Sequence, residues 1–582
     1  MLQISRFSIM AAALLALALT ACGDDEPSGP AKPDAPFGVT ATATGSTSIR
    51  VSFTSAAGVG SYSIERAEGA AGNFAQAGNA AAPSTPGTVT FDDTGLKVQT
   101  QYRYRVIAIS GSQSSDPSGE TAATTLALGA FARDVTGDIT ASTTWYADTT
   151  YTLKGFIHVG NGATLTIQPG TTIRGDEQSA LFVLRGAKIN AVGRADAPIV
   201  FTSSKAVGSR RAGDWGGLII IGNATINKTT ANPEVEGTGT DGTQVVSGKN
   251  YTLTYGGGTN DADDSGELKY VRVEFAGFAP RANQELNSFT FAAVGSGTRL
   301  SYLQAVYGLD DAFEFFGGTA TATHLVSYET GDDHFDMSEG FRGRLQNIIA
   351  LQTATVNINP LPGQNVASDP QGIENDGCDG AGCNNGFDSA PVNTPLVANF
   401  TLIGTGDINV GAGSSGGVGM VLRRGTGGYY VNGLVARWPR AAVSVRDQAT
   451  YDRAGAIPTP ILATADLALR NILVVESPNT FEAGSGRFTF DLAGNALTAG
   501  SDVAAQLFTT FPAQVTDATT ASAFDWTPTA VSALAAGGLA PFSGKLQTAA
   551  SIAPAVAATT YMGAAQPGGT KWWAGWTTYL RN

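Results

Sequence analysis

Two stretches of this chain decide its fold: Gly308-Leu-Asp-Asp-Ala-Phe-Glu-Phe-Phe-Gly317 and Thr330-Gly-Asp-Asp-His-Phe-Asp-Met-Ser-Glu339. Both contain Asp-Asp-x-Phe followed by an acidic residue, and the second begins its Asp-Asp pair 22 positions after the first. The stretches 372–377 and 419–424 are similar and indicate further copies after insertions. Self-similarity at a fixed, short period is the mark of a repeat architecture.

Short apolar runs separated by glycine or asparagine continue this pattern from about residue 130 to the end of the chain. None is followed by a helical pattern long enough to cross over a sheet. A period near 22 with three short strands and glycine at the corners predicts a parallel β-helix, in which each coil stacks on the last. The alternative is a second antiparallel sandwich, which the aligned repeats disfavour.

Residues 36–125 have a different pattern, in which apolar and polar residues alternate. Ile49, Val51 and Phe53 alternate with polar residues, and so do the residues of Tyr102-Arg-Tyr-Arg-Val106. About seven strands in roughly 90 residues predict a β-sandwich. The motif Leu96-x5-Tyr102-x-Tyr104 resembles the tyrosine-corner strand of fibronectin type III modules, with Phe53 in place of the usual tryptophan. The resemblance implies a spacer or protein-binding module without chemistry.

The region 130–582 is similar to bacterial secreted lipoproteins with right-handed parallel β-helix domains of the pectate-lyase-like type. The phrases that carry this resemblance are Ala163-Thr-Leu-Thr-Ile-Gln-Pro-Gly170, Gly213-Asp-Trp-Gly-Gly-Leu218, the Asp-Asp-x-Phe repeats and Trp572-Trp-Ala-Gly-Trp576. Members of this group largely lack an assigned activity, so the resemblance implies the fold more than the function. We expect an all-β protein whose Trp-rich C-terminal segment caps the open end of the β-helix.

The first 21 residues have the order of a secretory signal peptide: one basic residue, an apolar run, then small residues. Leu19-Thr20-Ala21-Cys22 resembles a bacterial lipobox, which implies cleavage before Cys22 and diacylation of its sulfur. Residues 22–35 are acidic and rich in proline and glycine, which is typical of a tether. We therefore expect an exported protein held by lipid at the outer membrane or cell surface. The alternative is an ordinary cleaved signal peptide with an incidental cysteine.

Composition narrows the function further. A chain of 582 residues is expected to have at least two domains. A net charge of −14 argues against nucleic acid as a partner. After Cys22, only Cys378 and Cys383 remain, and in an exported protein this pair predicts one small disulfide loop. Two free thiols are the alternative.

The acidic repeats supply the first candidate site. Stacking at the 22-residue period places Asp310 beside Asp332, Asp311 beside Asp333, and Glu314 beside Asp336. Carboxylates in neighbouring strands, about 4.8 Å apart, repel unless a cation or a proton intervenes. Ca²⁺ is the cofactor that such oxygen ligands predict. The alternative is that these aspartates cap turns by accepting hydrogen bonds from backbone amides.

Two further candidate sites follow from composition and spacing. The segment 261–267 carries Asp261, Asp263 and Glu267 and imitates the first half of a calcium loop without completing an EF-hand. A later basic and aromatic group is a candidate ligand-binding surface, with the alternative that its arginines pair with the acidic rows and its tyrosines pack under loops. Its members are Arg423, Arg424, Arg446, Tyr429 and Tyr430.

Together these features predict a lipid-anchored surface protein whose β-helix binds polysaccharide or another surface component. A calcium-dependent polysaccharide lyase or a glycoside hydrolase is the enzymatic alternative, and a structural surface-layer or adhesin component is the third. No catalytic residue is identified from the sequence, and binding is favoured over catalysis.

Overall fold

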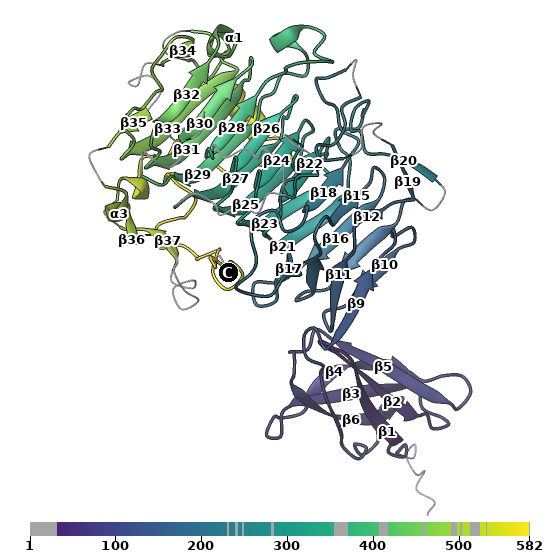
Figure 1. Cartoon of the computed structure of the whole chain (residues 1–582). Helices are drawn as coiled ribbons and strands as arrows, with labels where there is room; N and C mark the ends of the chain where they lie inside the picture. The colour runs from purple at the N-terminus through teal and green to yellow at the C-terminus, as the bar shows by residue number, and fades with distance from the viewer. Residues whose placement is uncertain are drawn as a thin grey trace, which may run out of the picture. The chain divides into compact units, whose positions relative to one another are not determined.

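The computed structural model describes residues 32–580, apart from 230–231, 239–242, 247–248, 281–283, 354–369, 407–416, 457–459, 491–496, 501–502, 512–523 and 531. The predicted signal peptide, Cys22 and most of the tether lie outside these residues. The chain divides into two compact units, Met1–Thr125 and Leu126–Asn582. The predicted all-β architecture, a fibronectin type III-like sandwich followed by a parallel β-helix, is confirmed (Figure 1).

The first unit is a two-sheet sandwich. Its strands are β1 (Phe37–Gly45), β2 (Ser48–Thr54), β3 (Ser61–Glu68), β4 (Ala75–Ala81), β5 (Thr88–Thr94), β6 (Gln101–Ser110), β7 (Gln113–Ser114) and β8 (Thr121–Thr124). One sheet has the order β1-β2-β5, and β4-β3-β6 is the centre of the other. Phe53 and Tyr62 meet edge to face at 4.7 Å in the core. The Tyr102 hydroxyl accepts a hydrogen bond from the Lys97 amide at 3.0 Å, which is the contact of a tyrosine corner.

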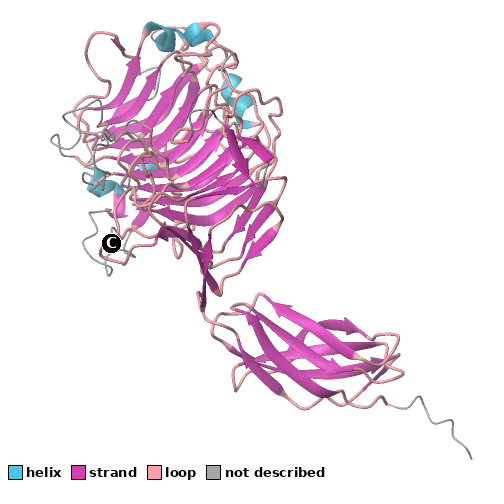
Figure 2. Ribbon diagram, turned by 45° about the vertical axis from the view of Figure 1, so that its right-hand side comes forward, coloured by secondary structure: helices cyan, strands magenta, loops and turns pink. Residues whose placement is uncertain are grey.

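The second unit is built from two long sheets whose strands stack coil upon coil (Figure 2). The fifteen-stranded sheet contains β9 (Phe131–Val135), β10 (Thr143–Trp145), β11 (Thr149–Leu153), β13 (Thr164–Ile167), β14 (Thr172–Gly175), β16 (Lys188–Val192), β17 (Ile199–Ser203), β21 (Gly266–Glu274), β23 (Arg299–Val306), β25 (Thr321–Tyr328), β27 (Arg344–Leu351), β29 (Leu396–Ile403), β31 (Gly428–Ala436), β33 (Leu467–Val475) and β35 (Leu497–Ala499). The ten-stranded sheet contains β12 (Phe156–Val159), β15 (Ala180–Val183), β18 (Leu218–Ile221), β22 (Phe289–Ala292), β24 (Phe313–Phe316), β26 (Phe335–Ser338), β28 (Ile373–Asp376), β30 (Val418–Arg423), β32 (Ala441–Arg446) and β34 (Arg487–Phe488).

Smaller elements lie outside these sheets. They are the pair β19 (Thr243–Val246) and β20 (Lys249–Thr252), the pair β36 (Phe508–Thr510) and β37 (Asp525–Pro528), the helices α1 (Gln448–Asp452), α3 (Ala504–Leu507) and α4 (Gly544–Ala550), and the 3-10 turns Gly386–Asp388 and Ala533–Ala535. No helix among the described residues is long and apolar enough to cross a membrane.

The predicted 22-residue coil is confirmed by strand pairing. Phe313 pairs with Phe335 in parallel register between β24 and β26, and their rings stack at 5.3 Å. Phe289 extends the same stack, 5.0 Å from Phe313. The copies predicted at 372–377 and 419–424 also pair, with Ile373 beside Met420. These inward-facing rings are buried at the centre of the β-helix, where dispersion and the loss of apolar surface from water hold neighbouring coils together.

From β21 to β33, each strand of the fifteen-stranded sheet bends once at a residue with a left-handed backbone. The first half of β21 pairs with β16 and its second half with β17. The bend residues stack in register from coil to coil. They are Tyr270, Tyr302, His324, Asn347, Asn399, Asn432 and Asn471, all with φ between +51° and +60°. Asparagine suits this position because its short polar side chain tolerates the left-handed region.

The C-terminal segment corrects one prediction. The Trp-rich stretch does not cap an end of the β-helix but lies on its flank, along the bend residues of interior coils. The Trp576 ring meets Tyr270 edge to face at 5.7 Å, and the Trp572 ring meets His324 at 4.9 Å. The Thr578 amide donates to Oε1 of Gln304 at 2.8 Å. Outward-facing rings and amides at the bends need partners, and the C-terminal segment supplies them.

Candidate functional site

The candidate site lies on the outer face of the ten-stranded sheet. Because side chains alternate along a strand, every second residue of β24, β26 and β28 points away from the core. Strand pairing places Glu314 beside Asp336, as predicted, and Glu374 extends the same outward column. Two positions further along, Ser338 is followed by Asp376 and Arg423 in a second column. The sheet therefore presents four carboxylates on three neighbouring strands.

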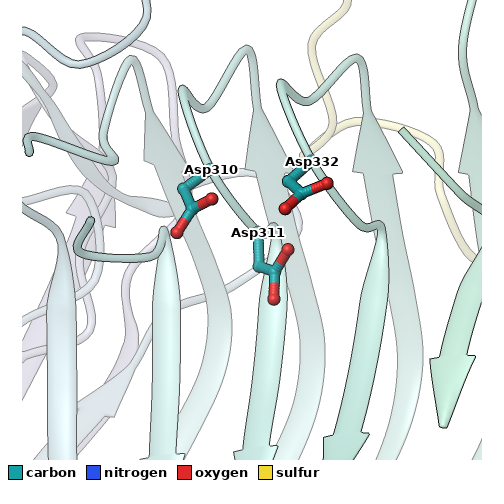
Figure 3. A group of neighbouring side chains, drawn as sticks. All are labelled: Asp310, Asp311 and Asp332. Atoms are coloured by element: carbon teal, nitrogen blue, oxygen red, sulfur yellow. The ribbon is translucent and has the colours of Figure 1, made fainter. Parts of the chain in front are cut away.

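Four more aspartates lie where loops enter these strands. Figure 3 shows Asp310 and Asp332 at successive corners, with Asp311 between them. The Asp333 amide donates to Oδ1 of Asp311 at 2.8 Å, and the Gln371 amide donates to Oδ1 of Asp333 at 3.1 Å. Asp311 and Asp333 therefore cap the next coil, which was the structural alternative for these residues.

The acidic residues bring several carboxylate oxygens together. Among the described residues, three groups have ligand atoms within 4.8 Å of one another: Asp310 with Asp311 and Asp332, Asp311 with Glu314 and Asp336, and Asp333 with Asp336 and Glu374. Asp336 belongs to two of these groups. Its Oδ1 is buried and accepts no hydrogen bond from any residue that the structure describes. Asp336 is therefore the centre of the acidic cluster.

A pocket of about 470 Å³ opens above this sheet, and we call it the acidic pocket. Glu314, Asp336 and Glu374 form part of its floor. Its other charged lining residues are Lys228, Glu236, Glu339, Asp376, Asp379, Arg423 and Arg424. Lys228 pairs with Glu339, and Arg424 pairs with Asp376 and, at 3.2 Å, with Asp379. Carboxylates outnumber cations in the pocket, so its charge is negative.

Burial and repulsion between like charges raise the pKa of these carboxyl groups. Burial is the larger cause for Asp336, and the nearby Glu374 and Asp376 add to it, so its pKa lies well above the usual range. The pKa of Glu314 is raised in the same way by burial, and then by Glu236 and Asp336. Burial raises the pKa of Glu374 and of Glu236 to about 7. The pocket favours bound protons or a bound cation over free carboxylates.

These residues fit a hard cation such as Ca²⁺. Carboxylate oxygens are the ligands that Ca²⁺ prefers, and six to eight are usually needed. The clusters around Asp336 offer several oxygens from adjacent rigid strands, one of them buried without a protein partner. Asp336 would hold the ion, either with Asp311 and Glu314 or with Asp333 and Glu374.

The predicted basic residues form ion pairs with acidic residues. Arg423 binds Glu374 and Asp376 from the neighbouring strand, in agreement with the structural alternative. Arg423, and not Arg424, aligns with Arg446, because Leu422 pairs with Val445. Arg446 lies 3.5 Å from Glu482. Arg423 and Arg446 therefore share one column of the sheet, and Arg424 does not belong to it.

Two predicted aromatic ligands are placed elsewhere. Tyr430 is fully buried inside the β-helix and accepts a hydrogen bond from Asn375, so its predicted role in ligand binding is wrong. Tyr429 is 5% exposed and donates to the Ala465 carbonyl at 3.0 Å. Alternation along β31 sends the two neighbouring tyrosines to opposite faces of the sheet, and neither faces the acidic pocket.

The predicted calcium loop at 261–267 does not converge. Asp261 accepts hydrogen bonds from Thr225 and pairs with Arg342 at 3.0 Å, whereas Glu267 pairs with Arg299 at 3.0 Å. Oδ2 of Asp263 accepts a hydrogen bond from Ser265 at 3.1 Å. Each carboxylate has a different partner, so the loop is an acidic turn whose carboxylates bind separate residues and do not share an ion.

Several residues of the acidic pocket escaped the sequence analysis. Asp376 lies two positions after Glu374, and strand alternation could have placed it on the same face. Glu236, Glu285 and Glu339 carry no repeat signal. Glu236 and Glu285 belong to insertions between strands, and only the folded chain brings Glu236 and Glu285 close enough to raise the pKa of Asp310.

Cys378 and Cys383 form a disulfide with their sulfur atoms 2.04 Å apart. The bridge closes a loop that directly follows β28. Asp379, inside this loop, lines the acidic pocket. The disulfide therefore fixes one side of the pocket's rim.

Comparison with known proteins agrees with this architecture. The pectate-lyase like β-helix domain matches residues 137–527, and the fibronectin type III domain matches residues 34–124. The chain belongs to the pectate-lyase like β-helix family. The two matches together point to a carbohydrate-related surface protein. The comparison with curated proteins finds no match.

Similar solved structures cover only a small part of the chain. A Fn3-like protein from Clostridium thermocellum is 25% identical, with 16% of this chain and 93% of that chain covered and a TM-score of 0.14. The FN5 domain of Drosophila Lar is 27% identical, with 16% and 97% covered and a TM-score of 0.13. The titin kinase with its flanking domains is 24% identical, with 16% and 17% covered and a TM-score of 0.14. The chain thus spans about a sixth of the titin structure, and nothing about the β-helix follows from these matches.

Proposed function

We propose that this chain is an exported, lipid-anchored surface protein that binds a polysaccharide in the acidic pocket, with Ca²⁺ held by the floor carboxylates. One observation carries the proposal: Glu314, Asp336 and Glu374 stand in register on adjacent strands beneath an open pocket. The carbohydrate-related family and the exported character of the N-terminal sequence support it. In this arrangement, the fibronectin type III module serves as a spacer.

A rigid sheet suits this task. The backbone of each floor residue is fixed by strands on both sides, so binding does not have to order a loop. Bound Ca²⁺ would supply a positive centre for the hydroxyl or carboxylate oxygens of a sugar. Arg423 and Arg424, already oriented by Glu374 and Asp376, lie at one side of the pocket and can donate further hydrogen bonds.

The test measures Ca²⁺ and glycan binding on the same protein. Titration calorimetry should detect Ca²⁺ binding, and a glycan array should show ligands that are lost in chelator. Asp336 belongs to two of the groups of neighbouring carboxylates, so Asp336→Asn removes a negative charge from both. We expect this variant to bind Ca²⁺ at least tenfold more weakly. Asp196→Asn, on an exposed aspartate paired with Arg194, is the matched control. Equal Ca²⁺ affinity in both variants would contradict the assigned site.

Glycoside hydrolysis is the second candidate, and a specific observation favours it. Retaining hydrolases use two carboxyl groups about 5–5.5 Å apart, one of them kept protonated by a raised pKa. Asp336 and Glu374 lie on adjacent strands with oxygens within 4.8 Å, and the pKa of Glu374 is raised to about 7. Release of new reducing ends from a bound glycan, abolished in Glu374→Gln, would establish this activity.

A lyase is supported less. A lyase needs a base that abstracts the proton beside a uronate carboxylate, and an arginine or lysine can serve as that base. The arginines at the acidic pocket, Arg423 and Arg424, are both bound to carboxylates. Unsaturated product ends that absorb ultraviolet light would be the evidence for a lyase.

A further inference from the structure

A second pocket, of about 560 Å³, lies on the outer face of the fifteen-stranded sheet, beside α4. We call it the arginine pocket. Arg344 of β27, Leu396 of β29 and Tyr429 of β31 are neighbours in one outward column of this sheet. The helix α4 packs on the same face through Leu546 and Ala550. The C-terminal segment thus forms one wall of the pocket.

Arg344 is the unusual residue of this pocket. It is 3% exposed, and burial lowers its pKa, yet an arginine stays charged at neutral pH. Its Nη2 donates to Oγ1 of Thr321 at 2.6 Å and to the Ala553 carbonyl at 3.3 Å. Throughout the described part of the chain, no carboxylate lies within 4.0 Å of its guanidinium group. A buried cation without a counter-ion is costly.

The other charges at the pocket are matched. Asp261 pairs with Arg342 at 3.0 Å, and Asp466 pairs with Lys545 at 2.6 Å. Two carboxylates against three cations leave the charge of Arg344 in excess. In addition, the Nε atom of Arg342 is buried and donates no hydrogen bond. In a protein with a net charge of −14, this pocket is a local positive site.

The rest of the lining is largely apolar. Leu396 and Tyr429 are almost fully buried in the sheet, and Ala549 and Ile552 come from the C-terminal segment. Ile552 is 53% exposed, so it lies at the solvent side. A ligand in this pocket would therefore meet a guanidinium group at one place and apolar surface elsewhere.

We propose that the arginine pocket binds a small organic anion with an apolar body. The negative group would accept hydrogen bonds from Arg344, and the apolar body would lie against Leu396, Tyr429 and Ile552. The acidic pocket lies on the other sheet, so this site does not depend on the proposed binding of polysaccharide.

The test uses the full mature chain and a fluorescent probe of matching chemistry, 8-anilinonaphthalene-1-sulfonate. We expect the folded protein to bind the probe at one saturable site and decanoate to displace it. Decanol has the same chain length without the charge, and it should displace the probe at least tenfold more weakly. Displacement by decanol as effective as by decanoate would overturn the proposal.

Two variants make the site assignment falsifiable. Arg344→Gln keeps hydrogen-bond donors but removes the charge, and it should weaken binding of probe and decanoate at least tenfold. Ile552→Glu places a negative charge at an exposed position of the lining, where it should weaken binding without disturbing the fold. Arg299→Gln is the control, because Arg299 stands in the same outward column, is exposed and pairs with Glu267.

The binding measurements on these variants either support or overturn the assigned site. If Arg344→Gln or Ile552→Glu weakens binding and Arg299→Gln does not, the site is supported. If both Arg344→Gln and Ile552→Glu bind like the wild type, Arg344 is a structural residue that only ties Thr321 to Ala553. If Arg344→Gln fails to fold, Ile552→Glu alone decides.

Discussion

At the scale of single residues, the β-helix holds carboxyl groups closer together than they would lie in water. Glu314, Asp336 and Glu374 face outward because their neighbours in sequence face the core. The strand spacing of about 4.8 Å then holds them closer than free carboxylates would stay. Burial adds to the repulsion between them, and the pKa of each is raised. Asp311 and Asp333 each also accept a hydrogen bond from a backbone amide, and burial raises the pKa of Asp311 as well.

Glu236 gives a prediction about pH. Burial and the charge of Glu285 raise its pKa from 4.5 in the unfolded chain to about 7 in the folded protein. A carboxyl with a raised folded pKa contributes its full stability below pH 4.5 and loses it as pH rises through 7. We expect Glu236→Gln to increase the free energy of unfolding at pH 8 by on the order of 1–3 kcal/mol. The variant should also flatten the fall in melting temperature between pH 5 and pH 8.

Thermal unfolding in chelator, measured from pH 4 to pH 8, checks this prediction. Glu177→Gln is the control, because Glu177 is an exposed glutamate on an early coil. An unchanged pH profile in Glu236→Gln would show that Glu236 is hydrated and ionised in the folded protein.

At the scale of elements, stacked side chains hold the coils in register. The rings of Phe289, Phe313 and Phe335 form one column, and Phe313 is between the other two. We expect Phe313→Ala to lower the free energy of unfolding by about 3–5 kcal/mol, because a rigid sheet cannot collapse around the cavity. Denaturant unfolding measures this loss. Val207→Ala, at a position 72% exposed, should change it by about 0.5 kcal/mol or less.

A second element-scale prediction concerns the C-terminal segment. Oδ1 of Asn432 accepts a hydrogen bond from the Leu539 amide at 2.6 Å, and its Nδ2 donates to the Thr559 carbonyl at 3.2 Å. Asn432 also has a left-handed backbone, with φ of +58°. Glycine adopts the left-handed backbone conformation easily, so Asn432→Gly loses only the side-chain hydrogen bonds. Asn432→Ala loses these hydrogen bonds and also has an unfavourable backbone conformation.

We therefore expect Asn432→Ala to be destabilised more than Asn432→Gly. Both variants should make the segment after residue 537 easier to cleave in limited proteolysis. Cleavage at the wild-type rate in both would mean that the aromatic contacts of Trp572 and Trp576 alone hold the segment.

At the scale of the whole molecule, two units with separate cores are joined in one chain. The sandwich has its own buried cluster around Phe53, Tyr62 and Tyr104, and the β-helix has a continuous core along its axis. This division suits a protein in which one unit serves as a spacer and the other presents two pockets.

The proposed lipid anchor is tested at this scale. In a bacterial host that processes lipoproteins, we expect the wild-type chain to partition into the detergent phase of Triton X-114. Cys22→Ser should move it to the aqueous phase, because the sulfur that would carry the acyl chains is gone. Asp24→Asn, which leaves the cysteine in place, is the control. Aqueous partitioning of the wild type would support the alternative of an ordinary cleaved signal peptide.

The sequence by itself determined the repeat, the coil length and the vertical neighbours. In a β-helix, residues that are one coil length apart in the sequence lie side by side in neighbouring coils. A period of 22 and strict alternation are therefore enough to place Phe313 next to Phe335 and Glu314 next to Asp336. The same alternation along β31 sends Tyr429 and Tyr430 to opposite faces of the sheet, so the sequence itself argues against one surface that contains both.

Only the tertiary structure decided what surrounds those columns. Glu236 reaches the acidic pocket from an insertion, and Glu285 comes close to Glu236 from another, and no period constrains the paths of these insertions. The C-terminal segment lies along the flank because the bend residues of distant coils contact it there, from Tyr270 against Trp576 to Asn471, which donates to the Gly537 carbonyl. The surroundings of Arg344 could not be predicted for the same reason. The segment that buries Arg344 lies about 200 residues later in the chain, so the sequence around Arg344 does not predict this contact.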